Sequence, residues 1–235
     1  MMKKIKRFIS KNKLLSSLIK SIYFKFNKKK DFQSKNYWDE RYAKGGNSGA
    51  GSYGRLAKFK AEIINDFFKK NNIKSVIEFG CGDGNQLSMF KAPKYIGLDV
   101  SKKSIEICKE KFISDKNKAF FLYPQYFIDR IHVFRADVTL SLDVIYHLIE
   151  DDIFEKYMKD LFSSSKKYVV IYSSNTDKQA KFQAQHVLHR KFSDWVEKNC
   201  PNWESISKIK NKFQLKNNEQ DESFANFYIY QKKVD

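Results

Sequence analysis

The sequence predicts an α/β fold with a mainly parallel seven-stranded sheet, an antiparallel edge strand and helices on both faces. Apolar segments rich in β-branched and aromatic residues alternate with helical segments along most of the chain, which is typical of a parallel sheet. Near the C-terminus two such segments follow one another directly, which indicates an antiparallel edge. The 235 residues, 42% of them hydrophobic, suffice for one sizeable core.

Each element is predicted from its local pattern. Apolar residues recur at helical spacing from Leu56 to Phe68, and Ser101 is well placed to cap the helix that follows it. The aromatic segment 124–135 receives no element. The expected helices are 34–44, 55–68, 101–111, 151–162 and 192–198, and the expected strands are 73–79, 94–100, 119–123, 136–144, 168–172, 203–209 and 224–230.

The first strand runs into three glycines at alternate positions, Gly80, Gly82 and Gly84. Glycine tolerates positive φ and lets the backbone approach a ligand closely, so a strand, this turn and a following helix can cradle a nucleotide-like molecule. An ordinary glycine-rich turn is the alternative.

The second strand ends in an acid, Asp99, which lies 19 residues after Gly80. An acid at the tip of the second strand of a doubly wound sheet is well placed to accept hydrogen bonds from ribose hydroxyls. A dinucleotide fingerprint requires a glycine where this chain has Asn85, so a dinucleotide-dependent oxidoreductase is disfavoured.

The pattern from Glu78 to Gly84, together with Asp99, resembles the first motifs of class I S-adenosylmethionine-dependent methyltransferases, and the strand 142–144 with the segment 145–148 follows them in order. The resemblance implies a Rossmann-like fold and S-adenosylmethionine as cofactor. By this resemblance the methionine part would be held by Glu78, Gly80, Gly82 and Gly84 and the ribose by Asp99, with Cys81, Val100 and Asp143 also in the cofactor site. Where many relatives have an acid for adenine, this chain has Tyr123 and Pro124.

The loop 45–54, which holds five glycines, and the segment 186–190 further resemble methyltransferases from bacterial surface-polysaccharide gene clusters. This resemblance implies a small acceptor that carries a sugar or a phosphate, with Tyr53, His186, His189 and Arg190 as candidate acceptor-binding residues. The loop and the helix before it are expected to form an N-terminal cover, within residues 34–72, that closes over a ligand. A flexible linker is the alternative.

Methyl transfer mainly needs alignment of acceptor, methyl group and sulfur, and it needs no metal. A neutral hydroxyl acceptor also needs a base. His147 is the first candidate, because it follows Asp143 by four residues at the rim of the fourth strand and imidazole titrates near neutral pH. Asp143, on the same rim, is the second candidate catalytic residue. A capping or packed histidine is the alternative. His189 is the reserve base, and Arg190 is a candidate phosphate clamp.

The net charge of +18 is concentrated at one end, because residues 1–30 contain 11 Lys or Arg and no acid. Apolar residues recur at helical spacing among these cations, so residues 1–33 are predicted to form a basic amphipathic helix and residues 34–235 the methyltransferase domain. The helix either contacts an anionic membrane peripherally or docks on the domain. With most of the excess charge in this tail, nucleic acid is not the expected partner.

Three cysteines, Cys81, Cys108 and Cys200, show neither a disulfide framework nor metal-ligand spacing, which favours a reducing cytoplasm. No apolar run is long enough to span a bilayer. An RNA methyltransferase and a non-catalytic module that retains the cofactor fold stay open as alternatives. The sequence does not specify the oligomeric state.

Overall fold

The structure is a computed structural model that describes residues 32–127, 129, 131–180, 183–215 and 221–233. The chain divides into two units, residues 1–32 and 33–235, and the second unit contains the sheet and its helices. Residues 1–31, where the amphipathic helix is predicted, lie outside the described residues.

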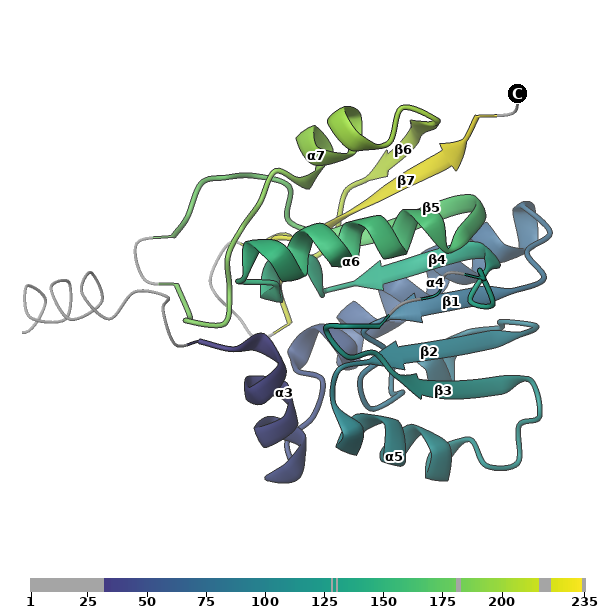
Figure 1. The fold of residues 1–235 in the computed structure, drawn as a ribbon, viewed down its shortest axis with the longest axis vertical. Helices are drawn as coiled ribbons and strands as arrows, with labels where there is room; N and C mark the ends of the chain where they lie inside the picture. The colour runs from purple at the N-terminus through teal and green to yellow at the C-terminus, as the bar shows by residue number, and fades with distance from the viewer. Residues whose placement is uncertain (1–31, 128, 130, 181–182, 216–220, 234–235) are drawn as a thin grey trace, which may run out of the picture. The chain divides into compact units, whose positions relative to one another are not determined.

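A seven-stranded sheet forms the centre of the unit, in the order β3-β2-β1-β4-β5-β7-β6 (Figure 1). The first five strands are parallel to their neighbours, and β7 runs antiparallel to both β5 and β6. The predicted fold class is therefore confirmed. The strands are β1 (Val76–Phe79), β2 (Tyr95–Asp99), β3 (Lys118–Leu122), β4 (Ala136–Leu142), β5 (Ser165–Ser173), β6 (Trp203–Ile209) and β7 (Asn226–Lys232).

Helices cover both faces of the sheet, because each has one apolar stripe to bury. On one face α4 (Gly54–Lys70) and α5 (Lys102–Lys111) pack against side chains such as Val76 and Val138. On the other face α6 (Asp151–Ser163) and α7 (Phe192–Asn199) pack against Ile77 and Ile171. The alternation of the β1 side chains between the two faces divides the core into two layers. As predicted, Ser101 caps α5, and its hydroxyl accepts from the Ser104 N–H at 3.4 Å.

The site is positioned by the sheet order. The chain leaves β1 toward β2 on one side and returns to β4 on the other, so the loops after these strands diverge and leave a crevice at their carboxyl ends. The first part of the unit lies across this edge. Helix α3 (Ser34–Ala43) is followed by a glycine-rich loop that contains the 3₁₀ turn η1 (Ala50–Ser52).

The fourth strand is shorter than predicted. It ends at Leu142, because Asp143 takes a φ of 61° that no strand can continue, and His147 lies on the 3₁₀ turn η3 (Ile145–His147). The short 3₁₀ turn η2 (Leu87–Met89) follows the glycine turn in place of a full helix. Within the described residues no helix combines the length and the apolar character needed to cross a membrane.

Candidate functional site

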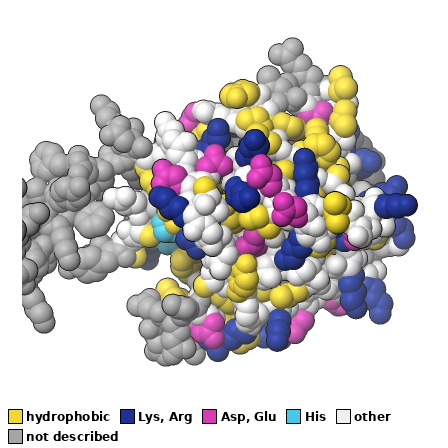
Figure 2. All heavy atoms as spheres, turned by 90° about the horizontal axis from the view of Figure 1, so that it is seen from below, with side chains coloured by type: hydrophobic (Ala, Val, Ile, Leu, Met, Phe, Trp, Pro, Cys, Tyr) yellow, Lys and Arg dark blue, Asp and Glu magenta, His cyan; other side chains and the backbone are white. Residues whose placement is uncertain are grey.

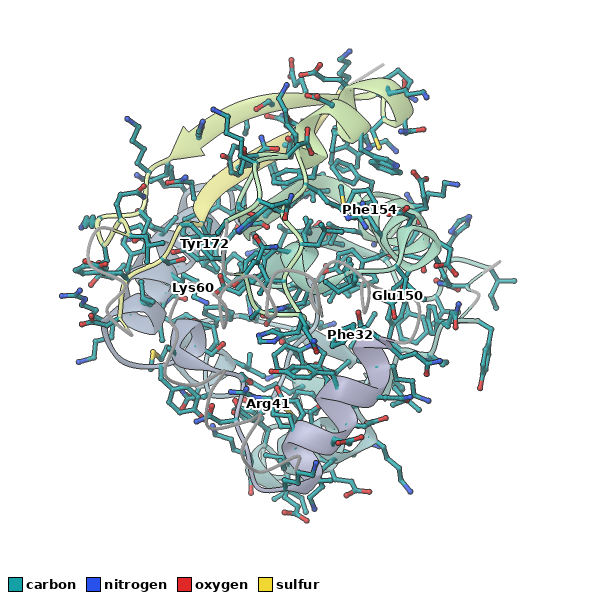
Figure 3. The ribbon with its side chains drawn as sticks, turned by 90° about the vertical axis from the view of Figure 1, so that its left-hand side faces the viewer. Phe32, Arg41, Lys60, Glu150, Phe154 and Tyr172 are labelled. Atoms are coloured by element: carbon teal, nitrogen blue, oxygen red, sulfur yellow. The ribbon has the colours of Figure 1, made fainter. Side chains whose placement is uncertain are left out.

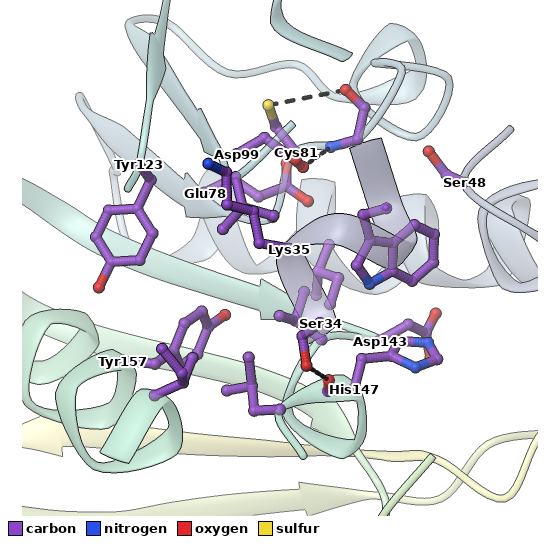
Figure 4. A pocket seen from close by; sticks show the side chains of 18 of the residues that line it. Ser34, Lys35, Ser48, Glu78, Cys81, Asp99, Tyr123, Asp143, His147 and Tyr157 are labelled. Carbon is purple, nitrogen blue, oxygen red and sulfur yellow. Dashed lines mark hydrogen bonds between the residues drawn. The ribbon is translucent and has the colours of Figure 1, made fainter. Parts of the chain in front are cut away.

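A cavity of about 310 Å³ opens at the carboxyl ends of β1, β2 and β4, beneath helix α3 (Figure 4). The buried acids Glu78 and Asp99 form one part of its lining, and the exposed or half-buried residues Gln33, Lys35, Gln125 and Glu150 form another, which we call its mouth. Among the predicted residues, the cavity wall contains Glu78, Gly80, Cys81, Gly82, Asp99, Val100, Asp143 and His147.

The glycine turn lies directly against the cover loop. Gly82 has a φ of 57°, and a Cβ atom on it would come within 2.2 Å of the Ser48 Oγ and 2.9 Å of the Tyr42 hydroxyl. Glycine is thus required here for its backbone conformation and for the close approach of the cover. Gly84, by contrast, faces helix α5 and does not line the cavity.

Asp99 is held rigidly at the tip of β2. Its two carboxylate oxygens accept from the backbone N–H groups of Gly82 and Ser101, each at 2.9 Å. Burial nevertheless raises the pKa of this carboxyl above its ordinary value, against the effect of these hydrogen bonds. Each carboxylate oxygen keeps acceptor capacity for a further donor, which fits the predicted role toward ribose hydroxyls.

Glu78 lies deeper in the cavity floor and is almost completely buried. Its Oε2 accepts from the Tyr95 hydroxyl at 2.5 Å, and burial raises its pKa to about 7. A positively charged ligand in the cavity would favour the ionised carboxylate. The Cys81 thiol also lines the cavity, and its hydrogen bond with the Cys108 thiol, together with burial, raises its pKa, so the thiol stays protonated.

Asp143 forms an ion pair that the sequence analysis missed. Its Oδ2 lies 2.6 Å from the Nζ of Lys60, which is fully buried on α4, and its Oδ1 accepts from the Tyr146 hydroxyl at 2.8 Å. The ammonium also lies 5.3 Å from the ring centre of Tyr172, which Figure 3 shows beside it. A signal for Lys60 is present in the sequence: it occupies the buried stripe of α4, four residues from both Leu56 and Ile64.

The ring of His147 has a fixed orientation and tautomer. Its Nδ1 lies 2.6 Å from the carbonyl oxygen of His186, and because a carbonyl only accepts, Nδ1 carries the proton and Nε2 the lone pair. Burial lowers the pKa of this imidazole to about 4. The predicted titration near pH 6.5 is therefore corrected, since His147 stays neutral throughout the physiological range.

The cover is attached at both ends. At the start of α3 the N–H and hydroxyl of Ser34 both donate to the Glu150 carboxylate, at 2.8 and 2.6 Å. In the glycine-rich loop, Ser48 N–H donates to the Asp83 carboxylate and Asp83 N–H donates back to the Ser48 hydroxyl. Between these attachments the ring of Trp38 lies edge-on to His147, 5.0 Å away.

None of the four candidate acceptor-binding residues lines the cavity, and the structure assigns them other contacts. The Tyr53 hydroxyl donates to Asp83, and His189 shares a hydrogen bond with the Ser174 hydroxyl. His186 stacks on Tyr37 behind His147. These side chains therefore contact the cover and the 174–191 connection, and the cavity wall does not include them.

Arg190 also differs from the prediction. Its guanidinium donates to the carbonyl oxygens of Leu148 and Ile149 and pairs with Asp151 at 2.7 Å. The Nε and Nη2 donors of Arg190 are thus used within the protein, and the residue does not line the cavity.

The wall beyond Asp99 is formed by residues of the β3–β4 connection and of α6. Tyr123 donates to Asp160 at 2.6 Å, and Gln125 donates to Asp152 at 3.1 Å. Both line the cavity, together with Val100 and Ile153. The part of the cavity where relatives place an acid for adenine is thus lined by an aromatic ring and an amide. Among the described residues no cluster of His, Cys, Asp or Glu could hold a metal ion.

Solved structures share this fold. NodS, an N-methyltransferase from Bradyrhizobium japonicum WM9 in complex with S-adenosyl-L-homocysteine, matches with a TM-score of 0.66 and 10% identity over 86% of this chain and 99% of that one. Magnesium protoporphyrin IX methyltransferase from Synechocystis PCC 6803 with bound SAH matches with a TM-score of 0.60 and 11% identity over 85% of this chain and 98% of that one. The methyltransferase domain of bacterial CtHen1-C matches with a TM-score of 0.56 and 18% identity over 74% of this chain and 97% of that one.

These likenesses establish the fold and leave the acceptor undetermined, because the neighbours act on different molecules. No curated protein matches the sequence. The sequence pattern of one family, described as a methyltransferase domain, matches residues 53–219, which include the glycine turn, Asp99, Asp143 and His147. The chain therefore belongs to the methyltransferase domain family and is a methyl-transferring enzyme.

Proposed function

We propose that the protein transfers the methyl group of S-adenosylmethionine to a hydroxyl oxygen of a small polar acceptor that carries a sugar or a phosphate, such as a precursor of a surface polysaccharide. The observation that carries the proposal is the His147 imidazole in the cavity wall, neutral and with its Nε2 lone pair unprotonated. A hydroxyl acceptor needs such a base, whereas an acceptor that is already anionic does not.

The cavity fits the cofactor. The Asp99 carboxylate has acceptor capacity for two ribose hydroxyls, and the amide oxygen of Gln86 is a buried acceptor without a partner in the cavity wall. When bound, S-adenosylmethionine supplies a methyl group made electrophilic by its sulfonium. Asp99, Gly82 and Glu78 would hold the cofactor, and the cover with Trp38 would exclude water.

His147 takes the acceptor proton at Nε2, and the His186 carbonyl keeps the Nδ1–H bond in both protonation states. Because burial disfavours the imidazolium, His147 is a weak base. A weak base suffices here, since the acceptor hydroxyl becomes strongly acidic as its oxygen acquires the methyl group. Proton transfer is therefore expected late, when the new bond is largely formed.

The size and polarity of the mouth favour a small acceptor. The cavity volume of about 310 Å³ is at the lower end of the range for ligand pockets, so only the reacting end of an acceptor can enter beside the cofactor. Gln33, Lys35, Gln125 and Glu150 form the mouth. Lys35 is exposed and has no ion-pair partner among the described residues, so it replaces Arg190 as the cation expected to meet a phosphate.

The charge distribution does not favour a nucleic-acid acceptor. Figure 2 shows acidic and basic side chains interspersed on the face that it presents, without a continuous basic surface. The strongest concentration of cations is in residues 1–30. We propose that this segment attaches the enzyme peripherally to anionic lipid at the cytoplasmic face of a membrane.

A methyl-transfer screen tests the acceptor. Full-length protein would be incubated with the cofactor and, in separate reactions, nucleotide sugars, sugar phosphates, cell-envelope extract and RNA, with mass spectrometry locating the added methyl. We expect O-methylation in a sugar-containing fraction. Methylation confined to RNA, or to a nitrogen atom, would overturn the proposal, and no turnover with any acceptor class would favour a cofactor-binding module.

A separate experiment tests the membrane attachment. The full chain should sediment with phosphatidylglycerol vesicles at low salt and be released by 0.5 M salt, whereas a chain without residues 1–30 should stay in solution and still bind SAH. Equal sedimentation of both chains would assign lipid binding to another surface. Loss of SAH binding on truncation would show that the segment belongs to the folded domain.

A further inference from the structure

Lys60 is a buried cation whose hydrogen-bond donors are only partly used. The ammonium has three N–H donors, and the Asp143 carboxylate is the one hydrogen-bond acceptor that the described part of the chain offers it. Its side chain is fully buried, and it forms part of the cavity wall. A buried ammonium is costly unless its hydrogen bonds are satisfied, so two unused donors at a ligand site indicate a ligand that accepts.

Gln86 offers the complementary group. Its Nε2 donates to the carbonyl oxygen of Ala57 at 2.9 Å, which fixes the orientation of the amide because a carbonyl cannot donate. The opposite atom, Oε1, is buried in the cavity wall without any partner among the described residues. A buried acceptor left unpaired costs free energy, so it indicates a ligand that donates.

Both residues are connected to α4, and both line the cavity. Ala57, which holds the Gln86 side chain, lies one helical turn before Lys60 on α4. Gln86 follows the glycine turn by two residues, and Lys60 meets Asp143 beyond the tip of β4. Asp99, which we assign to the ribose, ends β2 on the other side of β1 from β4.

We propose that Lys60 and Gln86 recognise the amino-acid end of the cofactor, with Lys60 binding its carboxylate and Gln86 accepting from its ammonium. The carboxylate then takes donors of Lys60 that Asp143 leaves unused, and the acidic wall of Glu78 and Asp143 offsets the positive charge of the ammonium. The inference rests on the cofactor alone, and it stands or falls independently of the acceptor proposed above.

The alternative role for Lys60 is to neutralise Asp143 and nothing else. Removing Lys60 by itself does not separate the two, because it would leave Asp143 buried without a counter-ion and could unfold the protein. The comparison is therefore made in an Asp143→Asn background. There, Lys60→Met removes the cation without leaving an unpaired charge.

The test measures binding by calorimetry, without acceptor, for two ligands. S-adenosylhomocysteine has the amino-acid end, and 5′-methylthioadenosine shares the adenosine and the sulfur but lacks that end. We expect Asp143→Asn/Lys60→Met to bind S-adenosylhomocysteine about 10- to 100-fold more weakly than Asp143→Asn, as for a lost charge-assisted hydrogen bond. Binding of 5′-methylthioadenosine should change less than about twofold.

The controls separate recognition from stability. Lys58→Met removes an exposed lysine from the same helix and should alter neither affinity. Amidation of the carboxylate of S-adenosylhomocysteine should abolish the difference between the two Asp143→Asn proteins. An equal loss for both ligands, or no loss for either, would overturn the role of Lys60.

Gln86 is tested by Gln86→Leu, which removes the acceptor and also the bond to α4. Weaker binding of S-adenosylhomocysteine with unchanged binding of 5′-methylthioadenosine is the expected result. If the variant only lowers the melting temperature and binds both ligands as before, Gln86 is a brace for α4, and its assignment to the ammonium is wrong.

Discussion

The two ends of the cavity are built in different ways. At the tips of β1 and β2, the Asp99 carboxylate is held by the backbone N–H groups of Ser101, two residues away in the sequence, and of Gly82, 17 residues away in the glycine turn. Under the cover, His147 is held by the carbonyl oxygen of His186 and by the ring of Trp38, 39 and 109 residues away in the sequence. One end depends on local backbone geometry, and the other on long-range side-chain packing.

This difference also appears in the electrostatics. Burial raises the pKa of Asp99 and of Glu78 at the first end, so it favours their neutral, protonated forms. Burial lowers the pKa of His147 at the second end, which again favours the neutral form, here the one without a proton. A bound cation would therefore stabilise the ionised forms of Asp99 and Glu78, whereas the neutral imidazole of His147 is available as a base.

The largest effect is expected at the cover end. His147→Ala should lower kcat by about 10² to 10⁴, as for the loss of a general base, and should change the affinity for S-adenosylhomocysteine little. Steady-state kinetics and calorimetry measure the two quantities. His132→Ala, in an exposed loop, is the matched control. A normal kcat in His147→Ala would show that the acceptor needs no base from this residue.

Stability against pH should separate the two ends. Glu78 has a folded pKa near 7, above its ordinary 4.5, so its folded form binds more protons and stability falls as the pH rises from 4.5 to 7. His147 has a folded pKa near 4, below its ordinary 6.5, so stability rises as the pH rises from 4 to 6.5. In the parent protein these opposing effects, of roughly 3 kcal/mol each, largely cancel.

Single substitutions reveal each effect. In Glu78→Gln only the effect of His147 remains, so the free energy of unfolding should increase between pH 4 and 6.5 more steeply than in the parent. In His147→Gln only the effect of Glu78 remains, so the free energy of unfolding should decrease between pH 4.5 and 7. Urea unfolding at half-unit pH steps measures both slopes. Parallel curves for the three proteins would show that neither group is perturbed by burial.

A smaller effect is expected from Asp99→Ala. Losing hydrogen bonds to the ribose hydroxyls should weaken S-adenosylhomocysteine binding by roughly 1.5 to 3 kcal/mol, as for bonds to a charged acceptor. Calorimetry measures the change. Asp66→Ala, at an exposed position of α4, serves as the control carboxylate. Undiminished affinity in Asp99→Ala would remove Asp99 from the cofactor site.

The smallest effect concerns the contact between glycine turn and cover. Gly82→Ala and Gly54→Ala both place a Cβ at positive φ, but only the first meets other atoms, namely Ser48 and Tyr42. Each should lose roughly 1 to 3 kcal/mol of unfolding free energy, more for Gly82, and only Gly82→Ala should also weaken cofactor binding. If both variants behave alike in denaturation and binding, the close contact of Ser48 and Tyr42 with Gly82 is not significant for stability or for cofactor binding.

The amino-acid sequence by itself determined the fold class and the cofactor end of the cavity. Alternating apolar segments and helices specify a parallel sheet, because each strand has to be covered on both faces. The glycine turn and Asp99 are recognisable because each follows directly after a strand: the turn needs glycine at Gly82, and the acid at the tip of β2 accepts from backbone N–H groups. The strands lie within a few residues of their predicted bounds, with β4 shorter than expected.

Only the tertiary structure decided how the cover end is built. The sequence suggested Tyr53, His186, His189 and Arg190 as acceptor contacts, yet each is engaged within the protein by groups distant in the sequence. It gave no role to Lys60, whose significance depends on Asp143, 83 residues away. Local pattern shows that such a side chain is polar or charged, whereas the partner that satisfies it, and so whether it is free for a ligand, is fixed by how distant segments pack.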